Sequence, residues 1–281
     1  MGSRESNPRL TQTASAIVES CRAALAKSIR APAKVRAASA PWAKGDPLPF
    51  ALLVLTGVTG LVDAVSFLGL GHVFTANMTG NVVFLGFAVA GTPGLSMARS
   101  STSLVAFLIG AALGGRLGVA MAAASRRRWL LTVAVSEALL LVTAAIASIG
   151  LDIGSATPPS RLYTVIVLTA LAMGLRNATV RRLAVPDLTT TVLTLTLTGL
   201  AADSSVAGGD NPRIGRRVAS VASMFAGAAV GTLLLRRGLA LPLVVSAVGV
   251  LAATVAYADV PAPPPAVGRH TAEPAVQDHA G

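Results

Sequence analysis

Charge is scarce in this chain of 281 residues, of which only 12% are Asp, Glu, Lys or Arg, whereas an ordinary soluble domain carries about 25%. Hydrophobic residues make up 53%, and the mean hydropathy is +0.68. The apolar residues lie in runs of about 20 rather than in an amphipathic pattern. These observations argue against a pair of soluble domains and predict a protein that crosses a membrane several times.

Reactive and metal-binding side chains are equally sparse. The one cysteine, Cys21, excludes an intrachain disulfide. The three histidines show no zinc-binding spacing, and the sequence has neither a nucleophile elbow nor a phosphate-binding loop. We therefore expect a protein that is not an enzyme, with no cofactor and no metal.

The basic residues are distributed unevenly. The net charge is +11, and eight of the 23 Lys and Arg residues lie within the first 44 positions, while most of the others flank apolar runs. This distribution indicates membrane topology and argues against a nucleic-acid partner. Residues 1–48 are predicted to form a basic, mostly disordered tail, and residues 259–281 a second disordered tail.

A polar pattern occurs twice within the apolar sequence. Copies separated by 114 or 115 residues are Gly60-Leu-Val-Asp63 and Gly174-Leu-Arg-Asn177, and Thr75-Ala-Asn77-Met-Thr79 and Thr190-Thr191-Val-Leu-Thr194. Such self-similarity indicates an internal duplication. We place membrane repeat 1 at residues 49–151 and membrane repeat 2 at residues 162–258.

Each repeat contains four apolar segments, so the predicted fold class is all-α, a polytopic transmembrane helix bundle built from two internal repeats. The segments are Phe50–Leu70, Val73–Ala90, Leu104–Ala124 and Trp129–Gly150, followed by Leu162–Arg176, Leu188–Ala202, Val218–Leu235 and Leu239–Tyr257. The second and the sixth are interrupted by polar residues, which is typical of re-entrant or broken helices.

The number of crossings follows from the charge of the loops. Eight full crossings would leave 14 basic residues inside and eight outside, whereas six crossings plus two re-entrant segments leave 18 inside and four outside; Arg116, inside a span, is counted in neither arrangement. Because short cytoplasmic loops are rich in Lys and Arg, the second arrangement is favoured. Three crossings per repeat would invert the second repeat, as in many secondary transporters. Eight crossings in parallel repeats are the alternative.

The duplicated polar pattern is the candidate solute- or ion-binding site, because polar side chains inside a membrane are costly and mark function by default. Asp63 lies about 20 Å along the first span, where a carboxylate needs a proton, a cation or a buried partner, and Arg176 is a candidate counter-ion. The alternative is that these groups only hold the helices together. The site comprises Asp63, Thr75, Asn77, Thr79, Gly80, Asn81, Arg176, Asn177, Thr190, Thr191 and Thr194.

Helical spacing adds two expectations. On one helix, Asn77 and Asn81 would share one face, and Thr75 and Thr79 would share another. Arg116 and Glu137 lie almost equally far in sequence from the basic turn at residues 126–128. They should therefore lie at one depth on consecutive spans and form a structural ion pair.

Small residues recur at a spacing of four in both halves, in the pairs Gly110 with Gly114 and Gly227 with Gly231. Such pairs permit close helix crossing. We expect that crossing to occur within the monomer, and a homodimer is the alternative.

The polar motifs resemble those of the YoaK-like family of bacterial membrane proteins, a domain of unknown function. The resemblance covers about Phe50 to Tyr257 and rests on Gly60-Leu-Val-Asp63-Ala-Val-Ser-Phe, Phe74-Thr-Ala-Asn77-Met-Thr-Gly80-Asn81, and Gly174-Leu-Arg-Asn177-Ala with Arg181-Arg182. It implies a multi-pass protein of the bacterial inner membrane and supplies no substrate. Leu195 stands where the family's second motif leads us to expect a glycine.

Two functions are consistent with the sequence. The leading hypothesis is a transporter or permease-like protein of the inner membrane for a small polar or charged solute, with the lipid bilayer as its surroundings. The alternative is a non-transporting scaffold or sensor whose basic tail docks on lipid or on a partner.

Overall fold

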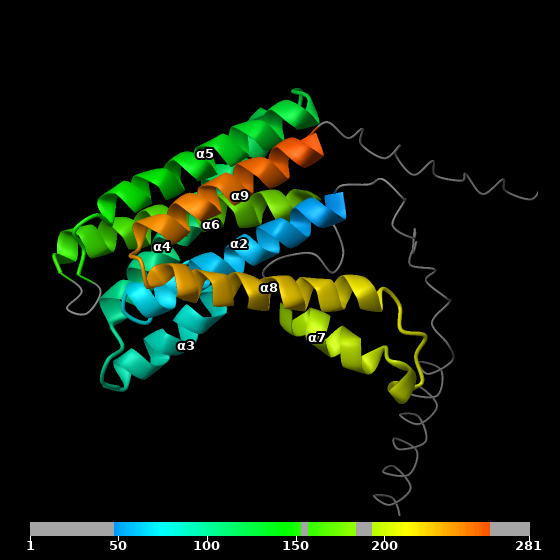
Figure 1. Ribbon diagram of the computed structural model, residues 1–281, viewed down its shortest axis with the longest axis horizontal. Coiled ribbons are helices and arrows are strands. Elements are labelled where there is room, and N and C mark those ends of the chain that lie inside the picture. The colour runs from blue at the N-terminus through cyan, green and yellow to red at the C-terminus, as the bar shows by residue number, and fades with distance from the viewer. Residues whose placement is uncertain (1–47, 153–156, 184–192, 259–281) are drawn as a thin grey trace, which may run out of the picture. The chain divides into compact units, whose positions relative to one another are not determined.

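The computed structural model describes residues 48–152, 157–183 and 193–258, which belong to one compact unit. Both predicted tails, apart from Leu48, lie outside these residues. The described part is helical, with α2 (Leu48–Gly69), α3 (Met78–Val89), α4 (Met97–Ala120), α5 (Arg126–Ala147), α6 (Pro159–Leu183), α7 (Leu193–Ala202), the 3₁₀ turn η1 (Ser205–Ala207), α8 (Ile214–Leu235) and α9 (Ala240–Ala258) (Figure 1). The predicted all-α class is confirmed.

Each predicted apolar segment corresponds to one helix, although some boundaries differ. α4 begins at Met97, before the predicted start at Leu104, because Ser96 caps it and its hydroxyl accepts a hydrogen bond from the Arg99 amide at 3.3 Å. α6 continues beyond Arg176 to Leu183. α3 is shorter than predicted, because the chain from residue 70 to 77 is not helical.

Five helices of the described part are long and apolar enough to cross a membrane, namely α2, α4, α5, α6 and α8. The described stretch of α9 is apolar but shorter. α3 and α7 have only 12 and 10 residues, which corresponds to about 18 Å and 15 Å. Neither spans a hydrocarbon core of about 30 Å.

The apolar core lies between α2, α5, α6 and α9. Each contributes side chains that are fully buried, such as Val62, Leu141, Ile166 and Leu243. The two remaining long helices pack against the four core helices, α4 chiefly against α6 and α8 chiefly against α2. The short helices α3 and α7 contact α4 and α8 respectively.

Glycines permit α2 and α8 to pack backbone to backbone. Gly227 of α8 lies against the backbone of Gly57, and one turn later Gly231 lies against the backbone of Leu61. Because the contacting positions increase together along both helices, α2 and α8 run parallel.

The contact between α4 and α6 is built in the same way. Gly110 lies against the backbone of Leu171, and Gly114 lies against that of Leu175. These helices also run parallel, and both predicted small-residue pairs are used for packing within one chain.

Replacing Gly110 with Leu is therefore expected to lower the free energy of unfolding by about 3 kcal/mol or more, because the new side chain would have to displace the backbone of α6. Gly115→Leu on the same helix is the matched control, since a Cβ there meets nothing within 4 Å. Thermal or denaturant unfolding in detergent measures both. Equal stability of the two variants would contradict the close α4–α6 contact.

Candidate functional site

The break between α2 and α3 is enclosed by protein. Residues 70–77 leave the helical path, yet Val73, Thr75 and Ala76 are buried. Non-helical backbone at membrane depth is tolerated only where protein or a water-filled cavity surrounds it. The break at residues 70–77 meets that requirement, because protein surrounds it.

Asn81 holds the backbone of this break. Its side-chain oxygen accepts a hydrogen bond from the Phe74 amide at 2.9 Å, and its side-chain nitrogen donates to the Phe74 carbonyl at 2.6 Å. The Ser103 hydroxyl of α4 donates to the same carbonyl, also at 2.6 Å. Asn81 is buried and is not among the residues that line a cavity here, so its amide satisfies the unwound chain instead of facing a solute.

Aromatic packing supports the same break. The Phe74 ring stacks on those of Phe67 and Phe84, with centroids 5.2 Å and 5.6 Å away, and the Phe67 and Phe84 rings are 6.1 Å from each other. A Cβ on Gly80 would lie 2.6 Å from the Phe74 ring. Gly80 is thus required for the ring to pack against α3.

Asp63 lies in the C-terminal half of α2 and reaches to the unwound segment. Its Oδ1 accepts a hydrogen bond from the Ala76 amide at 3.1 Å. Its Oδ2 is buried and has no hydrogen-bond partner within the described part of the chain. A carboxylate oxygen in that position can bind a proton, a cation or a donor group of a solute.

A cavity of about 340 Å³ opens beside Asp63. Four helices from both halves of the chain surround it, since α2, α3, α7 and α8 all contribute. The lining consists of the predicted site residues Asp63, Asn77, Thr79, Gly80 and Thr194, together with Thr59, Ala76, Val83, Phe84, Leu193 and Met224. The volume lies within the range of small-molecule sites.

The polar groups that line the cavity differ in their local roles. Asn77 precedes α3 but makes no capping hydrogen bond, and its side chain is exposed, as are those of Thr79 and Thr194. These groups can donate to or accept from a solute without breaking a helix cap. The expectation that Thr75 shares a helical face with Thr79 is wrong, because α3 begins only at Met78.

Other predicted residues lie elsewhere. Thr75 is fully buried in the break, and Asn177 donates from its side chain to the Met173 carbonyl at 2.8 Å within α6. Neither belongs to the lining of the Asp63 cavity. Thr190 and Thr191 lie outside the described residues.

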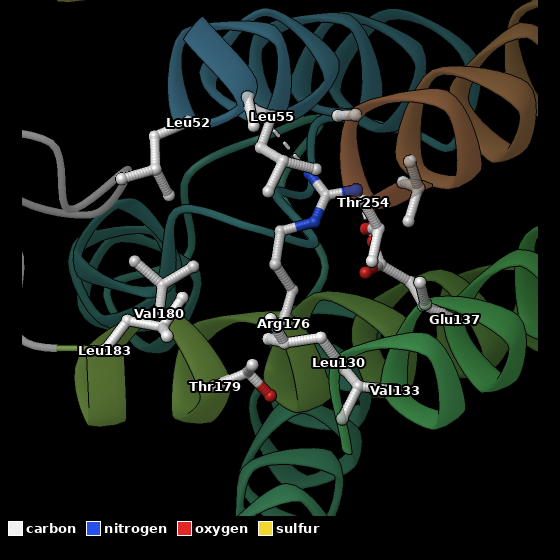
Figure 2. A pocket seen from close by; sticks show the side chains of 14 residues that line it. Leu52, Leu55, Leu130, Val133, Glu137, Arg176, Thr179, Val180, Leu183 and Thr254 are labelled. Carbon is white, nitrogen blue, oxygen red and sulfur yellow. Dashed lines mark hydrogen bonds and ion pairs between the residues drawn. The ribbon is translucent and has the colours of Figure 1, made fainter. Parts of the chain in front are cut away.

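Glu137 pairs with Arg176 rather than with Arg116. The carboxylate of α5 and the guanidinium of α6 form an ion pair, and both side chains are almost fully buried (Figure 2). Arg116 is exposed on α4. The prediction of an Arg116–Glu137 pair is wrong because α5 packs against α6 and α9 and barely touches α4, so the buried face of α5 turns away from Arg116.

Arg176 is also not the counter-ion of Asp63, contrary to the sequence-based expectation. Its Nη1 donates to the Leu55 carbonyl and to the Thr59 hydroxyl of α2, each at 3.2 Å. Thr59 in turn lines the Asp63 cavity. The Thr59 hydroxyl therefore connects the Glu137–Arg176 ion pair with the Asp63 cavity.

A second, much smaller cavity of about 40 Å³ adjoins the ion pair. Its walls are mostly apolar side chains of α2, α5, α6 and α9, and the polar residues that line it are Glu137, Arg176, Thr179 and Thr254. Figure 2 shows Leu52, Leu130 and Val180 around the Arg176 side chain. The volume suffices for about one or two water molecules. Arg176 and Thr59 thus separate the larger cavity from this smaller one.

Sequence reasoning overlooked Thr59, which connects the two features. It lies four residues before Asp63, so both side chains share one face of α2. That spacing was the available signal, but a threonine within an apolar run carries no distinctive motif.

The architecture defines the class of protein: a helical integral membrane protein with a partly polar interior. The chain belongs to the family described as "Protein of unknown function (DUF1275)", whose model matches residues 51–256. This result confirms the family resemblance drawn from the motifs.

One curated relative of the chain is the UPF0700 transmembrane protein YoaK of Bacillus subtilis (strain 168). The two sequences are 34% identical over 155 residues, which is 55% of this chain and 65% of the relative. The chain therefore matches slightly less than two thirds of that relative's length. No solved structure matches.

Proposed function

We propose that this protein is a permease-like protein of the bacterial inner membrane that binds, and by that means moves, a small polar solute with cationic character. The observation that carries the proposal is the cavity of about 340 Å³ whose lining combines Asp63 with hydroxyl and amide side chains. One buried carboxylate oxygen of Asp63 has no hydrogen-bond partner within the described residues. We keep the expectation of a non-enzymatic role as part of this proposal.

Asp63 has the central role in the proposal. Its negative charge would attract a cation, a protonated amine or a proton. Asn77, Thr79 and Thr194 would orient the solute by hydrogen bonds from two sides of the cavity. Because Asn177 stands at the corresponding place in the second half, the protein would have one charged site instead of two.

Helix packing supports the proposed duplication. Gly60 of α2 lies against α8 at Ala228, and Gly174 of α6 lies against α4 at Ala111. The members of these contacts correspond at constant offsets, since Gly174 follows Gly60 by 114 positions and Ala228 follows Ala111 by 117. In the proposed duplication, α2 corresponds to α6 and α4 corresponds to α8. The α2–α8 and α4–α6 contacts would then be equivalent, and each would join a helix of one repeat to a helix of the other.

The helix directions support the proposed inverted topology. With α3 and α7 too short to cross, repeat 1 would cross with α2, α4 and α5, and repeat 2 with α6, α8 and α9. Six crossings make α6 antiparallel to α2, whereas eight crossings would make these two helices parallel. Leu52, near the start of α2, lines one small cavity together with Val180 and Leu183 at the end of α6, in agreement with six crossings. Inverted repeats with interrupted helices around a central site are a recurring architecture of secondary transporters.

The proposal is tested by ligand-dependent stability of the purified full-length protein. The probes are sodium against N-methylglucamine at constant ionic strength, and methylammonium, ethanolamine and agmatine as small cationic solutes. A probe at 100 times its Kd is expected to stabilise the protein by about 2.7 kcal/mol. Asp63→Asn should abolish that stabilisation, because the amide cannot balance the charge of the probe.

The matched control is Asp210→Asn, which makes the same change at an exposed aspartate between α7 and α8. It should respond to the probes as the wild type does. Undiminished stabilisation of Asp63→Asn would contradict the role of Asp63. If no probe stabilised the wild type, the scaffold or sensor hypothesis would be preferred.

A further inference from the structure

Arg116 occupies an unusual position for a charged residue. It lies within α4, a helix long and apolar enough to span the membrane, and its side chain is exposed beside the exposed apolar residues Leu113 and Val119. Charged side chains of membrane spans ordinarily face the protein interior or pair with one another. The surroundings of Arg116 therefore need an explanation other than the Glu137 pair.

The stretch of sequence that contains Arg116 has no acidic residue to pair with it. Between Ala64 and Ser136 there are five arginines and neither Asp nor Glu. One of the two nearest acids in sequence, Glu137, is buried and paired with Arg176, and the other, Asp63, is buried at the α2–α3 break. Neither of these two described acids is available to Arg116, so we look for its anionic partner outside the described part of the chain.

A groove suited to an apolar chain is lined by Leu113 and Leu117, which flank Arg116 in the sequence of α4. Because α4 and α5 barely touch, a hollow of about 510 Å³ remains between them, and α6 forms its floor. Leu113 and Leu117 line one wall, Leu139 and Leu140 the other, and Leu171 the floor. Most of this surface is hydrocarbon, so it fits an acyl chain better than a polar solute.

The groove continues along α4. A second hollow of about 450 Å³ shares Leu171 with the first and is lined by Val105 and Ile109 of α4. From Val105 to Leu117 the helix rises by about 18 Å. That length suits the greater part of one phospholipid acyl chain, since a hydrocarbon core of two leaflets measures about 30 Å.

The charged end of the groove lies at the end of α4. Arg116 precedes the last residue of α4, Ala120, by four positions, a rise of about 6 Å. A long arginine side chain near a helix end extends to the headgroup level. α5 then begins with Arg126, Arg127 and Arg128, so the surface between the two helices carries several positive charges.

We propose that the groove between α4 and α5 binds an anionic phospholipid, with one acyl chain along α4 and the phosphate at Arg116. Basic surfaces between transmembrane helices bind lipid headgroups in this way. The proposed lipid site uses other helices and residues than the Asp63 cavity, so either proposal can fail alone.

The test compares how strongly different lipids bind to the full-length protein in detergent. Binding is measured by native mass spectrometry and by the shift in the unfolding temperature. Phosphatidylglycerol should bind to the wild type and raise its unfolding temperature more than phosphatidylcholine with the same acyl chains. Arg116→Gln should weaken binding of phosphatidylglycerol about fivefold, the effect of one basic contact. Arg236→Gln, at an exposed arginine just beyond α8, should leave it unchanged.

A second variant tests the acyl-chain part of the proposal. Ser136→Phe fills the groove, since Ser136 lines it, and should reduce binding of both lipids, whereas Ser136→Ala should not. Soluble glycerol 3-phosphate should have no effect on the wild type. Equal phosphatidylglycerol binding by Arg116→Gln and wild type, full binding by folded Ser136→Phe, or equal stabilisation by glycerol 3-phosphate would each overturn the proposal.

Discussion

Glu137→Gln is expected to lower the free energy of unfolding by about 3–5 kcal/mol, because it removes one partner of a buried ion pair and leaves the other charge uncompensated. Arg176 has 2% of its surface exposed, so solvent cannot replace the lost carboxylate. Its Nη1 would still donate to Leu55 and Thr59, but neither group is charged. Denaturant or thermal unfolding in detergent measures the loss.

The reciprocal variant Arg176→Met should be destabilised to a similar degree, since it leaves the Glu137 carboxylate buried without its partner. The double variant should be considerably more stable than the sum of both effects predicts, because exchange of a whole buried ion pair for neutral groups is often close to neutral. Such a double-mutant cycle isolates the pairwise coupling. Two additive effects would mean that these side chains do not interact.

Arg116→Gln is the matched control for the ion pair. Arg116 is exposed, so its replacement should change the stability of lipid-free protein by no more than about 0.5 kcal/mol. It should also show no coupling to Glu137→Gln. A coupling between Arg116 and Glu137 that exceeded the coupling between Arg176 and Glu137 would restore the pairing expected from spacing alone.

The error about Arg116 illustrates what sequence can determine in a helix bundle. Distance from the turn at residues 126–128 gives the depth of a residue on two consecutive helices, but not which neighbour its face contacts. The helices α4 and α5 barely touch, and Arg176 of the following helix α6 meets Glu137 instead. The packing of α5 against α6 and α9 decides the partner, and local spacing in the sequence does not contain that information.

The candidate site was predicted in outline for a physical reason. Polar side chains within apolar segments are rare enough to be recognised individually, and Asp63, Asn77, Thr79, Gly80 and Thr194 do line one cavity. Their separate roles were not predictable. Asn81 looks like Asn77 in the sequence, yet it is bound to the backbone of Phe74, because the unwound chain needs partners for its amide and carbonyl groups.

Topology gives the prediction with the most clear-cut outcome. With Cys21→Ser as background, Thr92→Cys, Ala123→Cys and Asp210→Cys place single thiols at exposed positions between α3 and α4, between α4 and α5, and between α7 and α8. Six crossings put residues 123 and 210 on one side of the membrane and residue 92 on the other. A membrane-impermeant maleimide should therefore label position 92 alone in intact cells, and all three positions in lysed cells.

Eight crossings would give a different pattern, because α3 and α7 would each move the chain to the opposite side. Residues 92 and 210 would then share a side, and residue 123 would be labelled alone in intact cells. Intact cells thus show labelling at position 92 alone for six crossings and at position 123 alone for eight crossings. Poor reactivity of one thiol cannot convert one of these results into the other. Labelling at position 92 alone would make the break at residues 70–77 the tip of a re-entrant segment. The Asp63 cavity would then lie between two inverted repeats, the place where alternating access requires a solute site.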